Sequence, residues 1–506
     1  MKPQPSHLSS LLANIKVPAN AATPGGYAVM GGDPVIAALT ADSRHAGPGT
    51  LFAALSGTKT DGRTFIADAL AKGSAAILTD ADAILPPTCS AAIIRANEPR
   101  WLLAQIAAQF FGAMPAHIAA ITGTNGKTST AQFVREIWTA LGASAASIGT
   151  LGVIGAKTSI YGTLTTPDAV TLHQTLANLV TDGVTHVALE ASSHGLFQYR
   201  LDGLEAEVAG FTNITRDHLD FHGTMENYYA AKARLFDVVL RARGTAVLNA
   251  DTPEATDLAA RSARRACRVL TYGHQGRDLK LLGITPQAHG QDLQIEVLGK
   301  KYTVPLAIVG KFQAWNALCA LGLCIGHGAD PDRAVAALAK LTGVHGRLQH
   351  VATHPSGAAI FVDYAHTPDA LETVLNALRP HVCTASGGRL LVVFGCGGNR
   401  DKGKRPVMGS IAQRVADIAI VTDDNPRFEE PATIRAEIMA GCQSTPLVHE
   451  VGDRHEAIRT AINLLQTGDI LVIAGKGHEP GQIIRNQVLP FDDGAVARTI
   501  LDEIQQ

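Results

Sequence analysis

The sequence predicts an α/β protein of three domains, built on parallel sheets that are flanked by helices. The chain has 506 residues, and about 150 residues per domain gives about three domains. Strand-like and helix-like stretches alternate along most of the chain, which favours parallel sheets with helices on both faces. The 49 glycines suit the many short strand-to-helix loops that such a fold needs.

Composition argues against several classes of protein. A chain that is 46% hydrophobic and 17% charged is globular, and a net charge of −2 does not mark a nucleic-acid or membrane-surface binder. No apolar run approaches the ~18–20 residues of a membrane span, and the first residues lack the apolar core of a secretion signal. Seven cysteines without a CxxC pair argue against a disulfide framework and a zinc ribbon. We therefore expect a cytoplasmic enzyme.

The first predicted domain covers residues 1–97, and the second covers residues 98–347. A proline-containing stretch near residues 97–100, ahead of a helix, sets the first boundary. In the central domain, apolar strands are expected at His117–Thr122 and at 185–190, with a shorter one at 245–248. The helix that follows the first of these strands carries apolar residues at i, i+3, i+4 and i+7, namely Val134, Ile137, Trp138 and Leu141.

A glycine-containing loop is expected between the strand His117–Thr122 and the helix that follows it. Its sequence indicates a shortened phosphate-binding loop. The strict pattern would need glycine at position 121, where this chain has isoleucine. Backbone N–H groups and the helix N-terminus would supply positive potential, Lys127 could reach the β- and γ-phosphates, and Thr128 could ligate Mg²⁺. The central domain is therefore expected to have a P-loop ATPase-type parallel sheet. The expected nucleotide-binding residues are Gly123, Thr124, Asn125, Gly126, Lys127, Thr128 and Ser129.

The kind of nucleotide chemistry is narrowed by signatures that the sequence lacks. It has no Asn-Lys-x-Asp motif for guanine recognition and no HRD or DFG signature of protein kinases. A GTPase and a protein kinase are therefore disfavoured. The segment 395–400 resembles a dinucleotide fingerprint, but Arg400 stands at its last glycine position, which argues against NAD.

Three further residues of the central domain could serve a phosphate site, although each has a simpler interpretation. Glu190 ends an apolar strand and could hold Mg²⁺, or it could be a solvated strand-end carboxylate. His218 lies in a run of two Asp and two His and could be a second metal ligand, or the run could only cap turns. Lys232 lies in a helical stretch and, on composition alone, is a surface lysine.

The third predicted domain covers residues 348–506, and a strand is expected to begin at Ala359. Three apolar strands, at 390–394, 418–422 and 470–474, each run into a polar loop. Because ligands bind outside the carboxyl ends of parallel strands, these loops should converge. Arg400 and Arg427 could then grip carboxylates, while Asp424 and Glu479 could receive ammonium groups. Without the neighbouring loops, Asp424–Arg427 would be an ordinary Asn-Pro turn with an exposed arginine.

The ordered set of motifs resembles the Mur ligase family, ATP-dependent amide ligases that build the peptide of bacterial cell-wall precursors. The resemblance runs from about Asp42 to the C-terminus. It rests on GTNGKTS (123–129), EASSHGLFQYR (190–200), NITRDHLDFHG (213–223), YAAKARLF (229–236), GKFQAWNALCA (310–320), GRL (346–348) and VDYAHTPDAL (362–371).

The resemblance implies roles for several of these residues. Lys232 matches a lysine that the family carbamylates, and the carbamate helps to bind a second Mg²⁺; Glu190 and His218 match metal-site positions. Asn316 matches an adenine contact, and Gln313 stands where the family commonly has Asn. Nucleotide contacts from the hinge and from the Rossmann-like third domain are implied at Arg347 and Asp363.

The first domain resembles the UDP-binding domain of the member that adds the third amino acid. Ser43, Thr58, Lys59 and Thr60 would lie near the UDP group, although that ligase often has His in place of Thr58. Residues implied to hold the muramoyl-peptide are Thr165, Thr166, Ser192, Gln198 and Arg200. Without the resemblance, Arg200 would be interpreted as a surface arginine.

The implied reaction joins meso-2,6-diaminopimelate to UDP-MurNAc-L-Ala-D-Glu with ATP and Mg²⁺, and we expect a monomer. Lysine lacks the distal carboxylate and would leave Arg427 unpaired, at a cost of about 1–3 kcal/mol. The amino-acid site would comprise Arg400, Asp424, Asn425, Pro426, Arg427, Gly475 and Glu479. A lysine-adding ligase, a folylpolyglutamate synthase and a non-catalytic nucleotide-binding regulator are the alternatives.

Overall fold

The computed structural model describes residues 4–15, 26–57, 60–86, 89–156, 159–160, 162, 164–287, 289–443 and 445–505. The chain divides into two compact units. The first comprises Met1–Tyr272 and Cys319–Asp330, and the second comprises Gly273–Leu318 and Pro331–Gln506. The predicted domain boundaries at 97/98 and 347/348 stay predictions.

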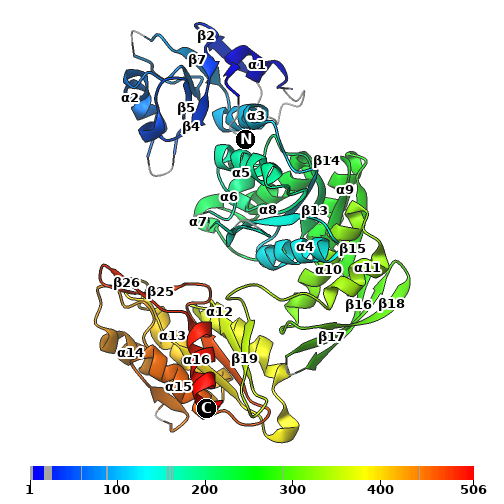
Figure 1. Cartoon of the computed structure of the whole chain (residues 1–506), viewed down its shortest axis with the longest axis vertical. Coiled ribbons are helices and arrows are strands. Elements are labelled where there is room, and N and C mark those ends of the chain that lie inside the picture. Colours follow the sequence, from blue (N-terminus) through cyan, green and yellow to red (C-terminus); the bar gives the residue numbers. More distant parts are fainter. Residues whose placement is uncertain are drawn as a thin grey trace. The chain divides into compact units, whose positions relative to one another are not determined.

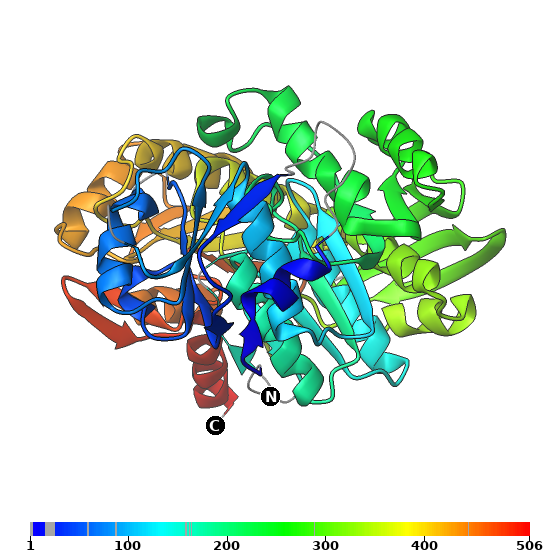
Figure 2. The same ribbon diagram turned by 90° about the horizontal axis from the view of Figure 1, so that it is seen from above.

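A small sheet forms from the first hundred residues, drawn in blue in Figure 2, with the strand order β2-β7-β6-β5-β4. All neighbours pair in parallel except β2 with β7. Side chains alternate along β5, so that Leu51 and Ala53 pack with α1 and α3 while Phe52 and Ala54 pack with α2. The elements are α1 (Leu8–Ala13), β2 (Tyr27–Met30), β4 (Ala38–Thr40), β5 (Thr50–Ala54), α2 (Ile66–Ala71), β6 (Ala76–Asp80), β7 (Ala92–Ala96) and α3 (Pro99–Phe111).

A larger sheet in the first unit has the order β11-β10-β9-β12-β8-β13-β14-β15. The strands from β9 to β15 pair in parallel, and β10 and β11 extend the edge antiparallel. Its strands are β8 (His117–Thr122), β9 (Ala145–Gly149), β10 (Gly152–Gly155), β11 (Ser159–Ile160), β12 (His186–Glu190), β13 (Ala206–Phe211), β14 (Leu240–Asn249) and β15 (Arg268–Gly273).

Helices cover both faces of this sheet, as predicted (Figure 1). The helix α4 (Lys127–Ala140) packs on β9 and β12 with its buried residues Val134, Ile137 and Trp138. The other face carries α5 (Ala169–Thr181), α6 (Ser193–Phe197), α8 (Met225–Arg234) and α9 (Glu254–Arg264). A short helix of this part, α7, spans Leu219–His222.

One strand prediction of the central part needs correction. The strand expected at 245–248 is β14, which begins at Leu240; exposed residues at 241–243 interrupt the apolar run on which the prediction rested. The second unit also contains an unpredicted antiparallel meander of β16 (Leu279–Gln287), β17 (Gly290–Val297) and β18 (Lys300–Leu306). The helices beside it in sequence are α10 (Phe312–His327), which spans the division between the units, and α11 (Pro331–Leu338).

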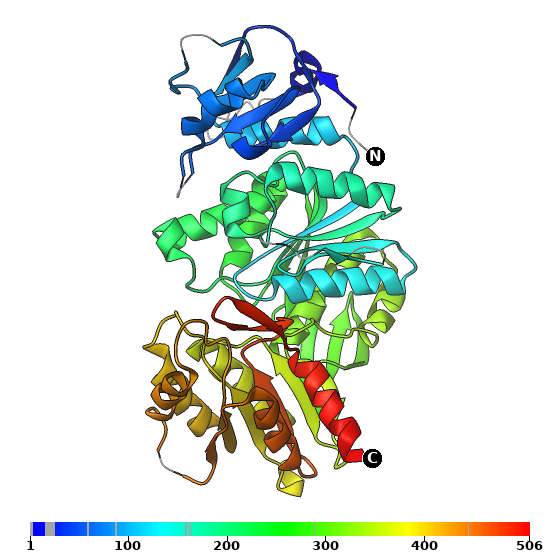
Figure 3. The same cartoon turned by 60° about the vertical axis from the view of Figure 1, so that its left-hand side comes forward.

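The C-terminal sheet has the order β19-β20-β24-β21-β22-β23 and is parallel except for β19. The helices α12, α13 and α14 cover one face, and α15 and α16 cover the other, which can be followed in Figure 3. Its elements are β19 (Gln349–Thr353), β20 (Ala359–Asp363), α12 (Pro368–Leu378), β21 (Leu390–Phe394), α13 (Lys404–Val415), β22 (Ile418–Val421), α14 (Pro431–Met439), β23 (Val448–Glu450), α15 (Arg454–Asn463), β24 (Ile470–Ala474) and α16 (Asp493–Gln505).

The strand expected to begin at Ala359 is confirmed as β20, but an unpredicted strand, β19, precedes it and pairs antiparallel with it. Most residues of β19 are only half-buried, so they lack the continuous apolar run that marks β20. Among the described residues, no helix has both the length and the apolarity that a membrane crossing requires.

Candidate functional site

The predicted phosphate loop lies between β8 and α4, as the sequence indicated. Gly123 and Gly126 have φ angles of 151° and 86°, which favour glycine. A methyl group on Gly123 would lie 1.9 Å from Thr212 Oγ1, so glycine is also required for space. The loop therefore has the backbone freedom and the helix N-terminus that suit a phosphate group.

A second loop, which follows β13, braces the phosphate loop. The N–H of Thr124 donates to the carbonyl oxygen of Asn213 at 2.8 Å, and the N–H of Asn125 donates to Asn213 Oδ1 at 3.0 Å. Thr212 Oγ1 donates to the carbonyl oxygen of Asn125 at 2.6 Å. Sequence reasoning gave Asn213 no role, although it opens the NITRDHLDFHG motif.

Two lysines meet at one carbonyl group of the phosphate loop. Lys127 Nζ lies 3.0 Å from the oxygen of Gly123, and Lys232 Nζ lies 2.7 Å from the same oxygen. Lys232 is only 1% exposed, so its interpretation as a surface lysine is wrong. Burial, aided by the charge of Lys127, lowers the pKa of Lys232 to about 6, and its amine is mostly neutral at pH 7.

Glu190 is a buried carboxylate beside the phosphate loop. It is 1% exposed, so the solvated strand-end alternative is also wrong. Its Oε2 accepts from Thr128 Oγ1 at 3.0 Å, and its Oε1 accepts from the N–H of Thr150 at 2.8 Å. A methyl group on Gly149 would lie 1.9 Å from Oε1, so that glycine leaves room for the carboxylate. Burial raises the pKa of Glu190. The carboxylate and hydroxyl oxygens are donors that suit Mg²⁺.

The residues expected to hold the muramoyl-peptide form one hydrogen-bonded group around Glu190. Thr166 Oγ1 donates to the carbonyl oxygen of Glu190 at 2.7 Å and accepts from the N–H of Ser192 at 3.0 Å. Arg200 Nη1 donates to the carbonyl oxygen of Thr166 at 2.6 Å, and its Nη2 donates to Gln198 Oε1 at 2.6 Å. Thr165 joins the group through a hydroxyl contact of 3.1 Å with Thr150.

His218 lies nearby in an uncommon backbone conformation. Its φ is 51°, and its side chain is 47% exposed. Its Nε2 lies 3.4 Å from an oxygen of Asp217, and its ring centroid lies 4.8 Å from that of His194. The negative charge of Asp217 also acts on Lys127 and Lys232. The metal role of His218 stays a prediction, and sequence reasoning missed Asp217 and His194.

The other expected nucleotide residues lie in the second unit. Asn316 is buried and donates to Gln313 Oε1 at 2.8 Å, so Gln313 orients its amide. Asp363 accepts from the N–H groups of Leu348 and Ala365, both at 2.7 Å. The first of these bonds fixes the backbone next to Arg347, whose guanidinium lies 4.8 Å from the Tyr364 ring centroid. Their contacts with a nucleotide stay predictions.

In the first domain, Ser43 and Thr60 lie in the segments after β4 and β5, which are parallel neighbours. Both segments therefore follow carboxyl ends of strands, where ligands bind in open α/β sheets. Thr58 and Lys59 lie outside the described residues.

A cavity of about 640 Å³ opens at the carboxyl ends of the C-terminal strands. The loops after β20, β21, β22 and β24 converge on it, as expected for parallel strands. It is lined by Tyr364, His366, Thr367, Pro368, Gly397, Arg400, Asp401, Gly403, Lys404, Val407, Asp424, Asn425, Arg427, Gly475 and Glu479. Pro426 is buried in the same loop, beside Arg427.

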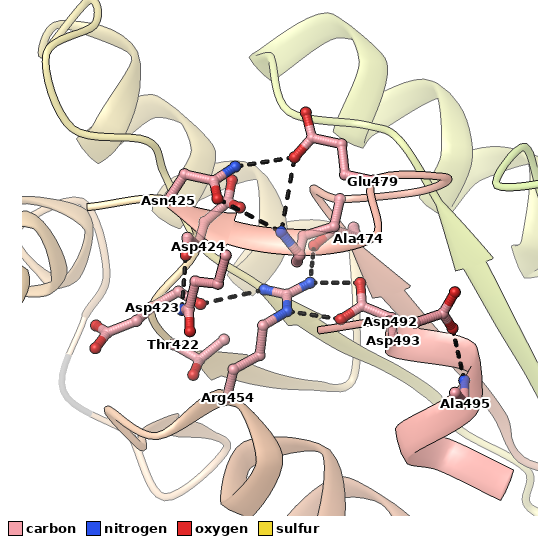
Figure 4. Close-up of polar contacts among 12 residues, drawn as sticks. Thr422, Asp423, Asp424, Asn425, Arg454, Ala474, Glu479, Asp492, Asp493 and Ala495 are labelled. Carbon is pink, nitrogen blue, oxygen red and sulfur yellow. Dashed lines mark hydrogen bonds and ion pairs between the residues drawn. The ribbon is translucent and has the colours of Figure 1, made fainter. Parts of the chain in front are cut away.

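The cavity places both signs of charge within one pocket. Asn425 Nδ2 donates to Glu479 Oε2 at 2.9 Å (Figure 4). Asp424 is buried, and its Oδ1 has no hydrogen-bond partner in the described part of the chain. A buried acceptor without a partner costs ~1–3 kcal/mol, so an ammonium group entering the cavity would be favoured there. Lys476, which sequence reasoning missed, is fully buried 3.6 Å from Glu479.

Arg427 is held in a strained conformation at the cavity. Its φ is 54°, which is unusual for a long side chain, and its Nη1 donates to the carbonyl oxygen of Gly398 at 3.0 Å. Strained backbones often occur where a side chain must be aimed at a ligand. Arg400 is exposed and lines the same cavity.

A fully buried ion pair supports the floor of this region. Arg454 forms two bonds to Asp493, of 2.7 and 2.8 Å, and donates to the carbonyl oxygen of Ala474 at the end of β24 (Figure 4). We expect Asp493→Ala to lower the free energy of unfolding by about 3–5 kcal/mol, because it leaves a buried guanidinium unpaired. Urea denaturation would measure this, with the exposed Asp502→Ala as control; a loss no larger than that of the control would contradict it.

Comparison with known proteins gives three family matches along the chain. The Mur ligase family, catalytic domain, matches residues 35–111; the Mur ligase middle domain matches 121–324; and the Mur ligase, glutamate ligase domain, matches 346–477.

Individual relatives cover nearly the whole chain. UDP-N-acetylmuramoyl-L-alanyl-D-glutamate–2,6-diaminopimelate ligase of Caulobacter vibrioides is 51% identical over 474 residues, which are 92% of this chain and 95% of that protein. A solved structure of a ligase of that name is 33% identical, covers 99% of this chain and 100% of its own, and has a TM-score of 0.74. The MurF ligase from Thermotoga maritima in complex with ADP, 20% identical with a TM-score of 0.56, covers 92% of this chain and 96% of its own and shares the fold.

Proposed function

The chain belongs to the Mur ligase family, and from this premise we propose that it joins meso-2,6-diaminopimelate to UDP-MurNAc-L-Ala-D-Glu. It is an ATP-dependent amide ligase of peptidoglycan precursor synthesis. The new bond forms at the γ-carboxylate of D-Glu, with ATP converted to ADP and phosphate. The observation that carries the proposal is the cavity that combines Arg400 and Arg427 with Asp424 and Glu479, a set of charges complementary to an amino acid.

The reaction has two steps. The D-Glu carboxylate takes the γ-phosphoryl group of ATP, which gives an acyl phosphate and ADP. The diaminopimelate amine then attacks the acyl carbon and forms the C–N bond of a tetrahedral intermediate. As this intermediate collapses, the C–O bond to phosphate breaks, phosphate leaves, and the nitrogen releases a proton to solvent. Lys127 stabilises charge on the transferring phosphoryl group, and the phosphate loop orients it through backbone N–H groups. Bound Mg²⁺, with Glu190 and Thr128 as oxygen ligands, would neutralise phosphate charge.

Lys232 has the environment that carbamylation requires. Its neutral amine can attack CO₂, forming an N–C bond and releasing a proton, which converts the amine into a negatively charged, carboxylate-like group. The pKa of about 6 leaves this amine available at pH 7, unlike that of a surface lysine. The carbamate would then lie beside the cationic Lys127, close to the phosphate loop.

The two ends of diaminopimelate match the two kinds of charge in the cavity. One end would be held with its carboxylate at Arg427 and its ammonium group at Asp424 and Glu479, and the carboxylate of the other end would pair with Arg400. The other end must keep its amine free for attack. The lysine-adding alternative leaves no carboxylate for one arginine, and the folylpolyglutamate alternative does not explain the family match over residues 35–111.

Replacement of Arg427 by alanine should weaken the use of diaminopimelate selectively. We expect kcat/KM for meso-diaminopimelate to fall about 10–100-fold, the equivalent of ~1–3 kcal/mol, because a carboxylate loses its partner. Phosphate release measures this. Arg414→Ala, an exposed arginine paired with Glu372 on α12, is the matched control. An equal loss for every amine acceptor would count against the role of Arg427.

Mass spectrometry of the product tests the function directly. Incubation with UDP-MurNAc-L-Ala-D-Glu, meso-diaminopimelate, ATP and Mg²⁺ should give a product heavier by one diaminopimelate residue, and omission of any reactant should prevent it. Absence of this product from folded protein would overturn the proposal. We place the reaction in the cytoplasm, carried out by a monomer without nucleic-acid partners or membrane insertion.

A further inference from the structure

Three histidines from separate elements meet at one end of the strands of the larger sheet in the first unit. The phosphate loop lies at the opposite end of these strands. His117 and His186 are the first residues of the parallel strands β8 and β12 and are paired in register. His327 is the last residue of α10. The phosphate loop follows the other end of β8, about 17 Å away at the rise of a β-strand. The cluster is therefore separate from the site of the proposed reaction.

The spacing of the three rings suits a metal ion. One ring nitrogen from each histidine lies within 4.8 Å of the other two. The centroid of the His117 ring lies 4.4 Å from that of His186 and 4.3 Å from that of His327. Zinc bound tetrahedrally at about 2.1 Å holds its nitrogens about 3.4 Å apart. Movements of about an ångström, within the reach of side-chain rotation, would bring the three rings onto one ion.

A partly buried carboxylate contacts two of the rings and orients them. Oε2 of Glu207, in β13, lies 2.8 Å from His117 Nδ1 and 2.9 Å from His327 Nε2, and its Oε1 pairs with Arg241 at 2.7 Å. His186 Nδ1 lies 2.8 Å from Thr185 Oγ1. A carboxylate that accepts from ligand histidines fixes their tautomers and orientation, which is the usual outer arrangement of histidine metal sites.

An indole N–H group lies beside the cluster. Trp138 packs against His186 with a centroid distance of 4.9 Å. Its buried Nε1–H has no acceptor in the described part of the chain. A metal-bound water is one acceptor that would satisfy it.

We propose that His117, His186 and His327 form a binding site for one borderline divalent metal ion, with Zn²⁺ the best match. Three imidazoles with one open position fit zinc or cobalt and do not fit Mg²⁺, which prefers oxygen ligands. The ion would link the ends of β8, β12 and α10. The site does not depend on the proposed ligase reaction.

Metal titration of the chelator-treated full chain tests the site. With millimolar Mg²⁺ present to occupy oxygen-rich sites, Zn²⁺ should bind with one equivalent at micromolar affinity or better. Saturation should raise the Tm of the transition that includes the first unit by roughly 3 °C. Co²⁺ should give the visible absorption of a tetrahedral nitrogen site.

His186→Gln and His327→Gln should each weaken Zn²⁺ binding at least tenfold. His455→Gln, which removes a partly exposed histidine of α15, should leave it unchanged. The Tm of each variant in chelator shows whether it folds. If neither folds, anomalous diffraction from Co²⁺-soaked crystals of the unaltered protein locates the ion. Overturning results are no binding equivalent in the unaltered protein, equal affinity in the cluster variants, or an ion located elsewhere.

Discussion

Replacement of Lys127 by alanine is expected to abolish product formation, with kcat lowered by about 10³-fold or more. Cationic groups that stabilise a transferring phosphoryl group commonly contribute this much. Lys127 opens α4, and its ammonium group already lies at the carbonyl oxygens of Gly123 and Thr124, 3.0 and 2.9 Å away. It is therefore positioned at the loop where the γ-phosphate would lie.

ADP formation with all three substrates measures the effect of Lys127→Ala. Lys340→Ala, which removes an exposed lysine after α11, should keep the activity of the unaltered protein. Circular dichroism and Tm would show that both variants fold. Turnover near that of the unaltered protein in folded Lys127→Ala would contradict the role assigned to this residue.

Lys232→Ala is expected to lower kcat by a comparable factor, because the carbamate that it would carry is lost. Unaltered protein depleted of CO₂ should lose activity and regain it on addition of bicarbonate. The alanine variant should not respond to bicarbonate, but a small carboxylate such as acetate, which can enter the space left by the side chain, should restore part of its activity. The rates of ADP formation under these four conditions distinguish the carbamate from a merely structural lysine.

The lowered pKa of Lys232 also predicts a pH dependence. Between pH 6 and the ordinary lysine value of 10.5, the unfolded chain holds a proton that the folded chain has released. This group therefore contributes stability that increases as the pH rises through that window. Recovery of activity with bicarbonate should likewise be slower below pH 6, where the amine is protonated. Full activity of Lys232→Ala without any added carboxylate would overturn this role.

Much of the site can be predicted from the sequence because its loops follow recognisable apolar strands. The segments His117–Thr122, Leu390–Phe394 and Ile470–Ala474 are continuous buried runs, and the structure has strands at these same bounds. Strands with one exposed face were harder to predict. The strand β19 and the meander from β16 to β18 have mixed exposure and no continuous apolar run.

Burial was the other quantity that local sequence could not provide. Lys232 and Glu190 look like surface residues within their own segments, and only the fold places them against the phosphate loop. The same holds for Lys476, whose partners come from segments up to 51 residues away. His117 and His186 are 69 residues apart in the sequence, and His186 and His327 are 141 residues apart. No local sequence motif therefore predicts that they form a cluster.

The most direct test of the account is phosphate release with UDP-MurNAc-L-Ala-D-Glu, ATP and Mg²⁺, comparing meso-diaminopimelate with L-lysine. The charges of the cavity predict turnover with diaminopimelate and at least a tenfold lower kcat/KM with lysine, since one arginine would then lack a carboxylate. Turnover that favours lysine would keep the ligase assignment and contradict the account of the cavity. Failure of folded, ATP-binding protein to turn over either amino acid would contradict the proposed function itself.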